Sequence, residues 1–124
     1  MTATQTIEDS LELDQVTPEQ YGNAVVKLLT LALNHDGSGS VAAAQVLLNL
    51  YNSKAFHVDL LDCACSFDAQ NFEYMLQVIK GRSIHGCWAE PHTMVKNGSE
   101  HFRKLWEKWE YLHVDKRYKK RGRR

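Results

Sequence analysis

Residues 17–33 read TPEQYGNAVVKLLTLAL, and this stretch decides the fold. Its first four residues form a capping box, with Thr17 as N-cap, Pro18 at the first helical position and Gln20 at the third. Apolar residues then recur at the i, i+3, i+4, i+7 spacing of a helix: Tyr21, Ala24, Val25, Leu28, Leu29, Ala32 and Leu33. The pattern predicts an amphipathic α-helix that begins at Pro18 and ends in the glycine-containing segment NHDGSGS.

Two further stretches repeat the helical spacing. Residues 41–52, with Ser40 as the expected cap, are apolar on several sides and predict a central helix. Residues 67–80 predict another helix, which we expect to stop at Gly81. Its expected buried face holds Phe72, Met75, Leu76 and Ile79.

The last predicted helix spans residues 99–113, where the apolar side chains again follow helical spacing. These side chains are Phe102, Leu105, Trp106, Trp109 and Leu112. Between Lys54 and Asp68 the pattern fits either a short strand or one helical turn capped by Asp59, and we favour the turn of helix. Residues 81–98 read as a long loop, compatible with a short strand or hairpin around Trp88.

Length and composition fit one soluble domain. The chain has 124 residues, 44% hydrophobic and 24% charged, enough for one core and unlike a disordered sequence. We therefore predict an all-α, single-domain bundle of about four main helices, with one long loop and a basic C-terminal tail. The expected divisions are an acidic segment 1–16, a helical domain 17–115 and a tail 116–124.

Charge is divided unevenly along the chain, although its formal total is zero. Residues 1–115 hold 15 acidic and 8 basic side chains, giving −7, and residues 116–124 hold 7 basic ones, giving +7. The candidate acidic binding residues are Glu8, Asp9, Glu12, Asp14 and Glu19. The candidate basic binding residues are Lys116, Arg117, Lys119, Lys120, Arg121, Arg123 and Arg124.

The N-terminal residues contain no cation and no apolar run, so we expect neither a signal peptide nor a transit peptide. No stretch approaches the ~20 apolar residues of a membrane span. The expected location is the cytoplasm of a bacterial host. The three cysteines, Cys63, Cys65 and Cys87, are then expected to be thiols.

Two clusters of Cys and His raise the question of zinc. Structural zinc sites usually take two ligand pairs, each spaced by two to four residues, whereas the pairs here are C-x-C and H-x-C. Buried thiols explain the cysteines better, and we expect no metal and no other cofactor. A Cys–His nucleophile lacks a third, orienting group, so we expect a protein without enzymatic activity.

Residues 39–112 resemble a small, uncharacterised helical family found in proteobacteria and on their plasmids and phages. The resemblance is carried by Gly39, Ser40, Ala44, Leu47, Leu48, Tyr51, Asn52, Asp59, Leu60, Asp62, Asp68 and Trp109. The chain departs from the family pattern at the Cys63–Cys65 segment, in the loop 81–98 and at both charged ends. The resemblance implies a helical fold and a mobile-element context, and it implies no activity.

Two functions are consistent with the charge division. In the first, the acidic part of a phage or mobile-element protein occupies a basic nucleic-acid-binding groove of a host protein or ribonucleoprotein complex, as anti-CRISPR inhibitors do. In the second, the basic tail grips phosphates and the chain is a nucleic-acid-binding accessory protein. The first is the preferred hypothesis because it agrees with the implied context.

Overall fold

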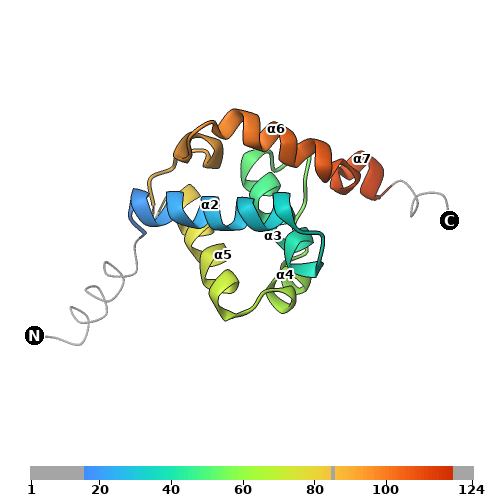
Figure 1. Cartoon of the computed structure of the whole chain (residues 1–124), viewed down its shortest axis with the longest axis horizontal. Helices are drawn as coiled ribbons and strands as arrows, with labels where there is room; N and C mark the ends of the chain where they lie inside the picture. The colour runs from blue at the N-terminus through green and yellow to red at the C-terminus, as the bar shows by residue number, and fades with distance from the viewer. Residues whose placement is uncertain (1–15, 85, 119–124) are drawn as a thin grey trace, which may run out of the picture.

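The computed structural model describes residues 16–84 and 86–118, and the described chain folds into an all-α domain. The elements in chain order are α2 Pro18–Asn34, α3 Ser38–Tyr51, α4 Leu60–Ser66, α5 Ala69–Arg82, η1 Pro91–Met94, α6 Gly98–Lys108, η2 Glu110–Leu112 and α7 Val114–Arg117. Four of these helices exceed ten residues, α2, α3, α5 and α6, as the sequence predicted. Helix α2 crosses the middle of the domain, and α6 and α7 follow one another along one side (Figure 1).

The capping box at the start of α2 is confirmed. The Thr17 hydroxyl accepts the Gln20 N–H at 3.1 Å, and the Gln20 side chain accepts the Thr17 N–H at 2.9 Å. The predicted spacing also places the core, because the buried residues of α2 are Tyr21, Ala24, Val25, Leu28, Leu29 and Ala32. Helix α3 supplies the opposing surface, and seven of its consecutive residues, 42–48, are buried.

Three predicted helix ends are wrong: the start of α3 and both ends of α5. Helix α3 begins at Ser38 with Gly37 as N-cap, so Ser40 lies inside the first turn, where its buried hydroxyl has no hydrogen-bond partner within the described residues. Helix α5 starts after its N-cap Asp68, two residues later than predicted, and continues through Gly81 to Arg82. Gly81 does not stop the helix, because its role is packing: a Cβ atom there would overlap the ring of Tyr21.

The buried face of α5 also differs in part from the prediction. Met75 is buried, as expected, and so is Val78, which the predicted face omitted. Ile79 is 38% exposed, and Phe72 and Leu76 are half-buried. The buried face is therefore turned toward Val78 and Gly81, because α5 packs closely on the first turn of α2 at Tyr21.

The predicted final helix, residues 99–113, is broken: α6 and η2 share that range, and α7 follows it. Helix α6 ends at Lys108, and η2 and α7 follow after changes of direction at Trp109 and His113. The change at Trp109 brings its indole N–H to the Ala32 carbonyl at 3.0 Å, and Leu112 still reaches the core. In the described part of loop 81–98 there is one 3-10 turn and no strand, so the hairpin alternative around Trp88 is not observed.

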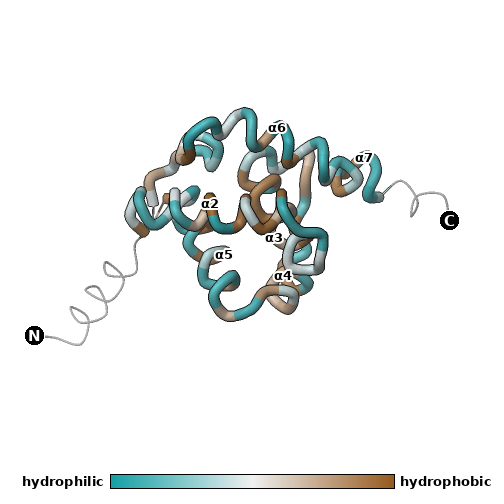
Figure 2. The backbone as a smooth tube through the Cα atoms, viewed as in Figure 1, coloured by the Kyte–Doolittle hydropathy of each residue, from teal (hydrophilic) through white to brown (hydrophobic). Residues whose placement is uncertain are grey.

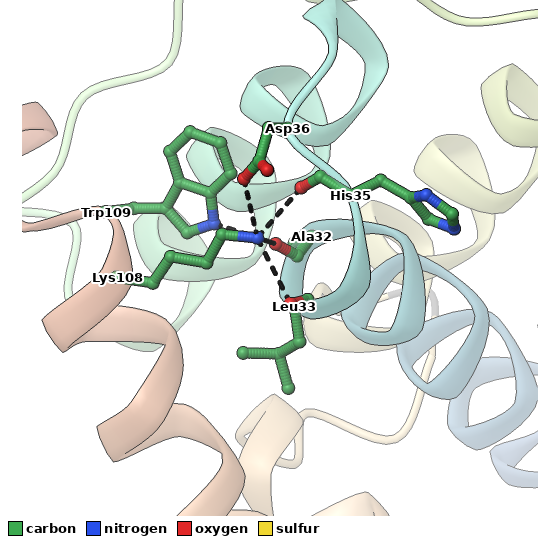
Figure 3. Close-up of polar contacts among 6 residues, drawn as sticks. All are labelled: Ala32, Leu33, His35, Asp36, Lys108 and Trp109. Carbon is green, nitrogen blue, oxygen red and sulfur yellow. Dashed lines mark hydrogen bonds and ion pairs between the residues drawn. The ribbon is translucent and has the colours of Figure 1, made fainter.

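A polar clamp, formed by Lys108 and Trp109, joins the end of α6 to the end of α2 (Figure 3). The Lys108 ammonium lies 3.1 Å from the Asp36 carboxylate. It also donates to three backbone carbonyls, those of Ala32, Leu33 and His35, at 2.9, 3.1 and 2.8 Å. Because the last carbonyls of a helix lack intrahelical partners and carry partial negative charge, this cation stabilises the α2 C-terminus.

Candidate functional site

The sequence-predicted acidic residues fall mostly outside the described chain. Four of the five lie outside the described residues: Glu8, Asp9, Glu12 and Asp14. The fifth, Glu19, is exposed on the first turn of α2. Residues 16–118 hold 11 acidic and 10 basic side chains, so this part has a formal charge of −1. The acidic excess of the N-terminal part is therefore only partly a property of the folded domain.

The basic residues are divided in the same way. Lys119, Lys120, Arg121, Arg123 and Arg124 lie outside the described residues, whereas Lys116 and Arg117 belong to α7. The Arg117 guanidinium donates to the His57 carbonyl and, at 3.2 Å, to the Gln45 side-chain oxygen. Lys116 pairs with Glu110 at 3.1 Å. Both cations thus have partners within the fold.

Tyr118, at the end of the described chain, lies beside His57. Its hydroxyl is 3.2 Å from His57 Nδ1, and the two ring centroids are 5.6 Å apart. Together with the Arg117 contacts, this attaches the last described residues to the domain. We call Arg117 and Tyr118 the tail root.

A second surface was not identified from the sequence, and it lies on α4. Leu60 is 64% exposed and Leu61 is 74% exposed, in the first turn of a helix that packs on α3 through Cys63. Asp59, Asp62 and Cys65 are exposed beside them. Figure 2 shows the apolar character of this helix at the edge of the domain. The five residues 59–62 and 65 are called the α4 surface.

Hydrogen bonds and a buried cysteine attach the α4 surface to the rest of the domain. Asp59 is the N-cap, as predicted, and its carboxylate accepts the Asp62 N–H at 3.1 Å. Gln45, which is only 3% exposed, accepts the Asp59 N–H at 3.0 Å. Cys63 is fully buried, with its thiol 3.8 Å from the Ala42 carbonyl. The exposed leucines therefore sit on a backbone that is already ordered, which lowers the entropic cost of binding.

The sequence around the α4 surface carries only negative charges. Residues 55–79 contain four carboxylates, Asp59, Asp62, Asp68 and Glu73, and no Lys or Arg. Arg117 approaches this region, where its guanidinium donates to the His57 carbonyl and the Gln45 side-chain oxygen. The α4 surface thus combines two adjacent exposed leucines with the carboxylates of Asp59 and Asp62.

The cysteines differ in environment. Burial raises the pKa of the Cys63 thiol to about 11, and the nearby carboxylates of Asp62 and Asp59 act in the same direction against Arg117. Cys65 is exposed, and Cys87 donates to the Gly81 carbonyl at 3.6 Å. Within the described residues no group of three or more His, Cys, Asp or Glu is placed to hold a metal ion, and His85 lies outside them.

These features define a small all-α protein with an exposed acidic–apolar helix. The chain belongs to DUF7673, a family of unknown function, whose model matches residues 22–110. The matched range includes the α4 surface and the Lys108–Trp109 clamp, and it ends before the tail root. Comparisons with curated proteins and with solved structures find no match. Among the described helices, none is long and apolar enough to cross a membrane.

Proposed function

We propose that this protein is a non-enzymatic inhibitor that binds and blocks a nucleic-acid-handling complex of a bacterial host, as anti-CRISPR proteins do. The observation that carries the proposal is the α4 surface, with Leu60 and Leu61 exposed between carboxylates on a helix whose start is held by hydrogen bonds. The carboxylates steer the surface toward a basic groove, and the leucines supply apolar contacts once it is there. A groove occupied in this way no longer accepts its nucleic acid.

The mobile-element part of the proposal has separate support. The resemblance of residues 39–112 stated above implies a mobile-element context, and an inhibitor of host complexes fits that context. The place of action is then the host cytoplasm. Segment 1–16 adds four carboxylates to the sequence, those of Glu8, Asp9, Glu12 and Asp14, and Glu19 is exposed on α2.

The test starts from full-length protein immobilised and exposed to a proteobacterial lysate, with and without nuclease. A partner that is retained after nuclease is purified and mixed with its own nucleic acid ligand. Competition between that ligand and the inhibitor is the expected result, because both occupy one groove. Loss of every partner on nuclease treatment, or simultaneous binding of both ligands, would overturn the proposal.

Charge-neutralising variants then locate the contact. Asp59→Asn with Asp62→Asn removes two charges and keeps an N-cap residue at position 59, so the fold is retained. We expect association with the partner to slow at least about tenfold at low salt. Glu100→Gln, an exposed carboxylate on α6 that pairs with Lys104, is the matched control and should change the rate less than about twofold.

A nucleic-acid-binding accessory role is the second candidate, and the tail root favours it. Because Arg117 and Tyr118 are attached to the domain, the five cations of residues 119–124 start from a fixed point. Five phosphate contacts give a slope of log K against log salt of about −4.5 on duplex DNA. Deleting residues 119–124 should bring this slope toward zero, and a slope unchanged by the deletion would contradict the role.

A further inference from the structure

A polar cleft of about 400 Å³ lies between the C-terminal ends of α3 and α5, and neither proposed function uses it. Its walls come from the last turn of α3, the residues that follow it and one side chain of α5. The lining residues are Asn49, Leu50, Tyr51, Asn52, Ser53, Lys54 and Arg82. We call it the α3–α5 cleft. Its size is within the range of small-ligand sites in proteins.

The charge of the cleft is positive. Lys54 and Arg82 both line it, no lining residue is a carboxylate, and neither cation is ion-paired within residues 16–84 and 86–118. Asn and Ser side chains add hydrogen-bonding groups. A concave surface with two cations and polar neighbours suits a phosphate group.

The cleft lies at two helix C-termini, whose backbone carbonyls carry partial negative charge and repel an anion. At the end of α5, the Gly81 carbonyl accepts the N–H groups of Cys87 and Trp88 at 3.1 and 3.2 Å. At the end of α3, the Leu48 carbonyl accepts the Asn52 N–H at 2.8 Å. These carbonyls are engaged by backbone donors, which reduces their opposition to an anion beside the cations.

Trp88 is hydrogen-bonded to Arg82, a residue that lines the cleft, and has an unusual conformation. Its φ of 61° is left-handed, which is rare for a bulky residue, and its side chain is 62% exposed. Arg82 Nη1 donates to the Trp88 carbonyl at 3.1 Å, so a cation of the cleft holds this backbone directly. A strained residue that is held in place and yet presents an indole to solvent is typical of a functional position.

We infer that the α3–α5 cleft and Trp88 bind a nucleotide unit of single-stranded nucleic acid. The phosphate lies between Lys54 and Arg82, and a base stacks on the exposed indole of Trp88. A single strand is the ligand because its bases offer free faces for stacking, whereas those of a duplex are stacked on one another. This site does not depend on the α4 surface and does not require the tail.

The test measures binding of full-length protein to a fluorescein-labelled oligothymidylate of about ten nucleotides, within the site sizes of single-strand binders. Lys54→Gln should weaken binding by about fivefold or more, because one phosphate contact is lost. Trp88→Ala should weaken it by about 5- to 100-fold, the usual effect of losing one stacked base, and should remove the quenching of indole fluorescence by the oligonucleotide. Arg82→Gln should act like Lys54→Gln.

Lys27→Gln is the matched control, because Lys27 is an exposed cation on α2 that does not line the cleft. Equal losses in Lys27→Gln and Lys54→Gln would mean general charge attraction and would overturn the inference. Since Lys54 makes no ion pair with a described residue, Lys54→Gln tests the site even if Arg82→Gln disturbs the loop. Thymidine monophosphate should bind at least about tenfold more weakly than the single strand, and Trp88→Ala should change binding of a duplex of equal length by less than about twofold. Equal affinity for the mononucleotide, or an equal loss by Trp88→Ala on the duplex, would overturn the assignment of the ligand.

Discussion

Helices α2 and α4 show opposite uses of apolar side chains. In α2, six of 17 residues are buried, and both ends are tied to distant segments: the Tyr21 hydroxyl donates to the Ala89 carbonyl, and the Ala32 carbonyl accepts from Trp109. In α4, Cys63 is the one buried residue of seven, and two leucines face solvent. The difference indicates that stability depends on α2, whereas the outer face of α4 is free for binding. Four predictions test this contrast.

The largest effect is expected at the C-terminal end of α2. Trp109 is 4% exposed, and its indole both fills the core and donates to the Ala32 carbonyl. Trp109→Ala should lower the free energy of unfolding by about 3–5 kcal/mol, measured by urea denaturation followed by circular dichroism.

The matched variant Trp109→Phe separates packing from hydrogen bonding. It keeps most of the apolar volume and removes the indole N–H, while the Lys108 ammonium still donates to the Ala32 carbonyl at 2.9 Å. The expected loss is therefore about 1–2 kcal/mol. If Trp109→Ala is as mild as Trp109→Phe, the α2–α6 junction is not the main source of stability.

The next effect is expected at the N-terminal end of α2. Gly81 of α5 leaves no room for a Cβ atom beside the buried ring of Tyr21. Gly81→Ala should lower the free energy of unfolding by about 1–3 kcal/mol, although alanine favours a helix. The control Gly37→Ala meets no atom within 4 Å of its Cβ and should cost less than about 1 kcal/mol. A stabilising Gly81→Ala would show that α5 can move away from α2.

A smaller effect is expected at the tail root. Arg117→Gln removes donors to His57 and Gln45, but the Gln45 oxygen keeps the Asp59 N–H as a partner. The expected loss of stability is about 1 kcal/mol, with faster amide hydrogen exchange confined to α7 and the start of α4. Arg103→Gln, from a surface pair on α6 with 60% and 63% exposed side chains, should change stability by less than about 0.5 kcal/mol. A loss of protection throughout the domain would contradict a local role for Arg117.

Local sequence signals predicted most of the fold. The capping box at Thr17, the N-cap at Asp59 and the apolar spacing of α2 depend on neighbours within a few residues, so they can be read from the sequence. The errors at Ser40 and Gly81 have a different origin. Both residues have local preferences for helix ends, and both are overruled by burial against other helices, which no local pattern contains.

The candidate sites were harder to predict for the same reason. The charge division identified Lys116 and Arg117 as basic residues, but it gave no sign that their partners are Glu110, His57 and Gln45. For the α4 surface the sequence contains one weak signal: two leucines directly follow the N-cap aspartate. So close to the start of a short helix, the apolar spacing does not show which side faces the core. The α3–α5 cleft joins residues from two distant helix ends and left no such signal.

The smallest effect on stability is expected at the α4 surface, where the effect on binding should be largest. Leu60 and Leu61 are 64% and 74% exposed, so the double variant Leu60→Ser/Leu61→Ser removes little buried area and should change the free energy of unfolding by less than about 1 kcal/mol. If these leucines are the apolar centre of a partner interface, the same variant should weaken that interface by at least about 30-fold, in accord with the usual 2 kcal/mol or more of a hot spot. Tyr111→Ser, another exposed apolar side chain at 55%, is the control and should leave binding unchanged.

Alkylation of the exposed Cys65 gives an independent readout, since a bound partner should slow it in the unaltered protein and should not in the double variant. Strong destabilisation by the serines would mean that α4 contributes to the core after all, and unaltered binding would remove the leucines from the interface.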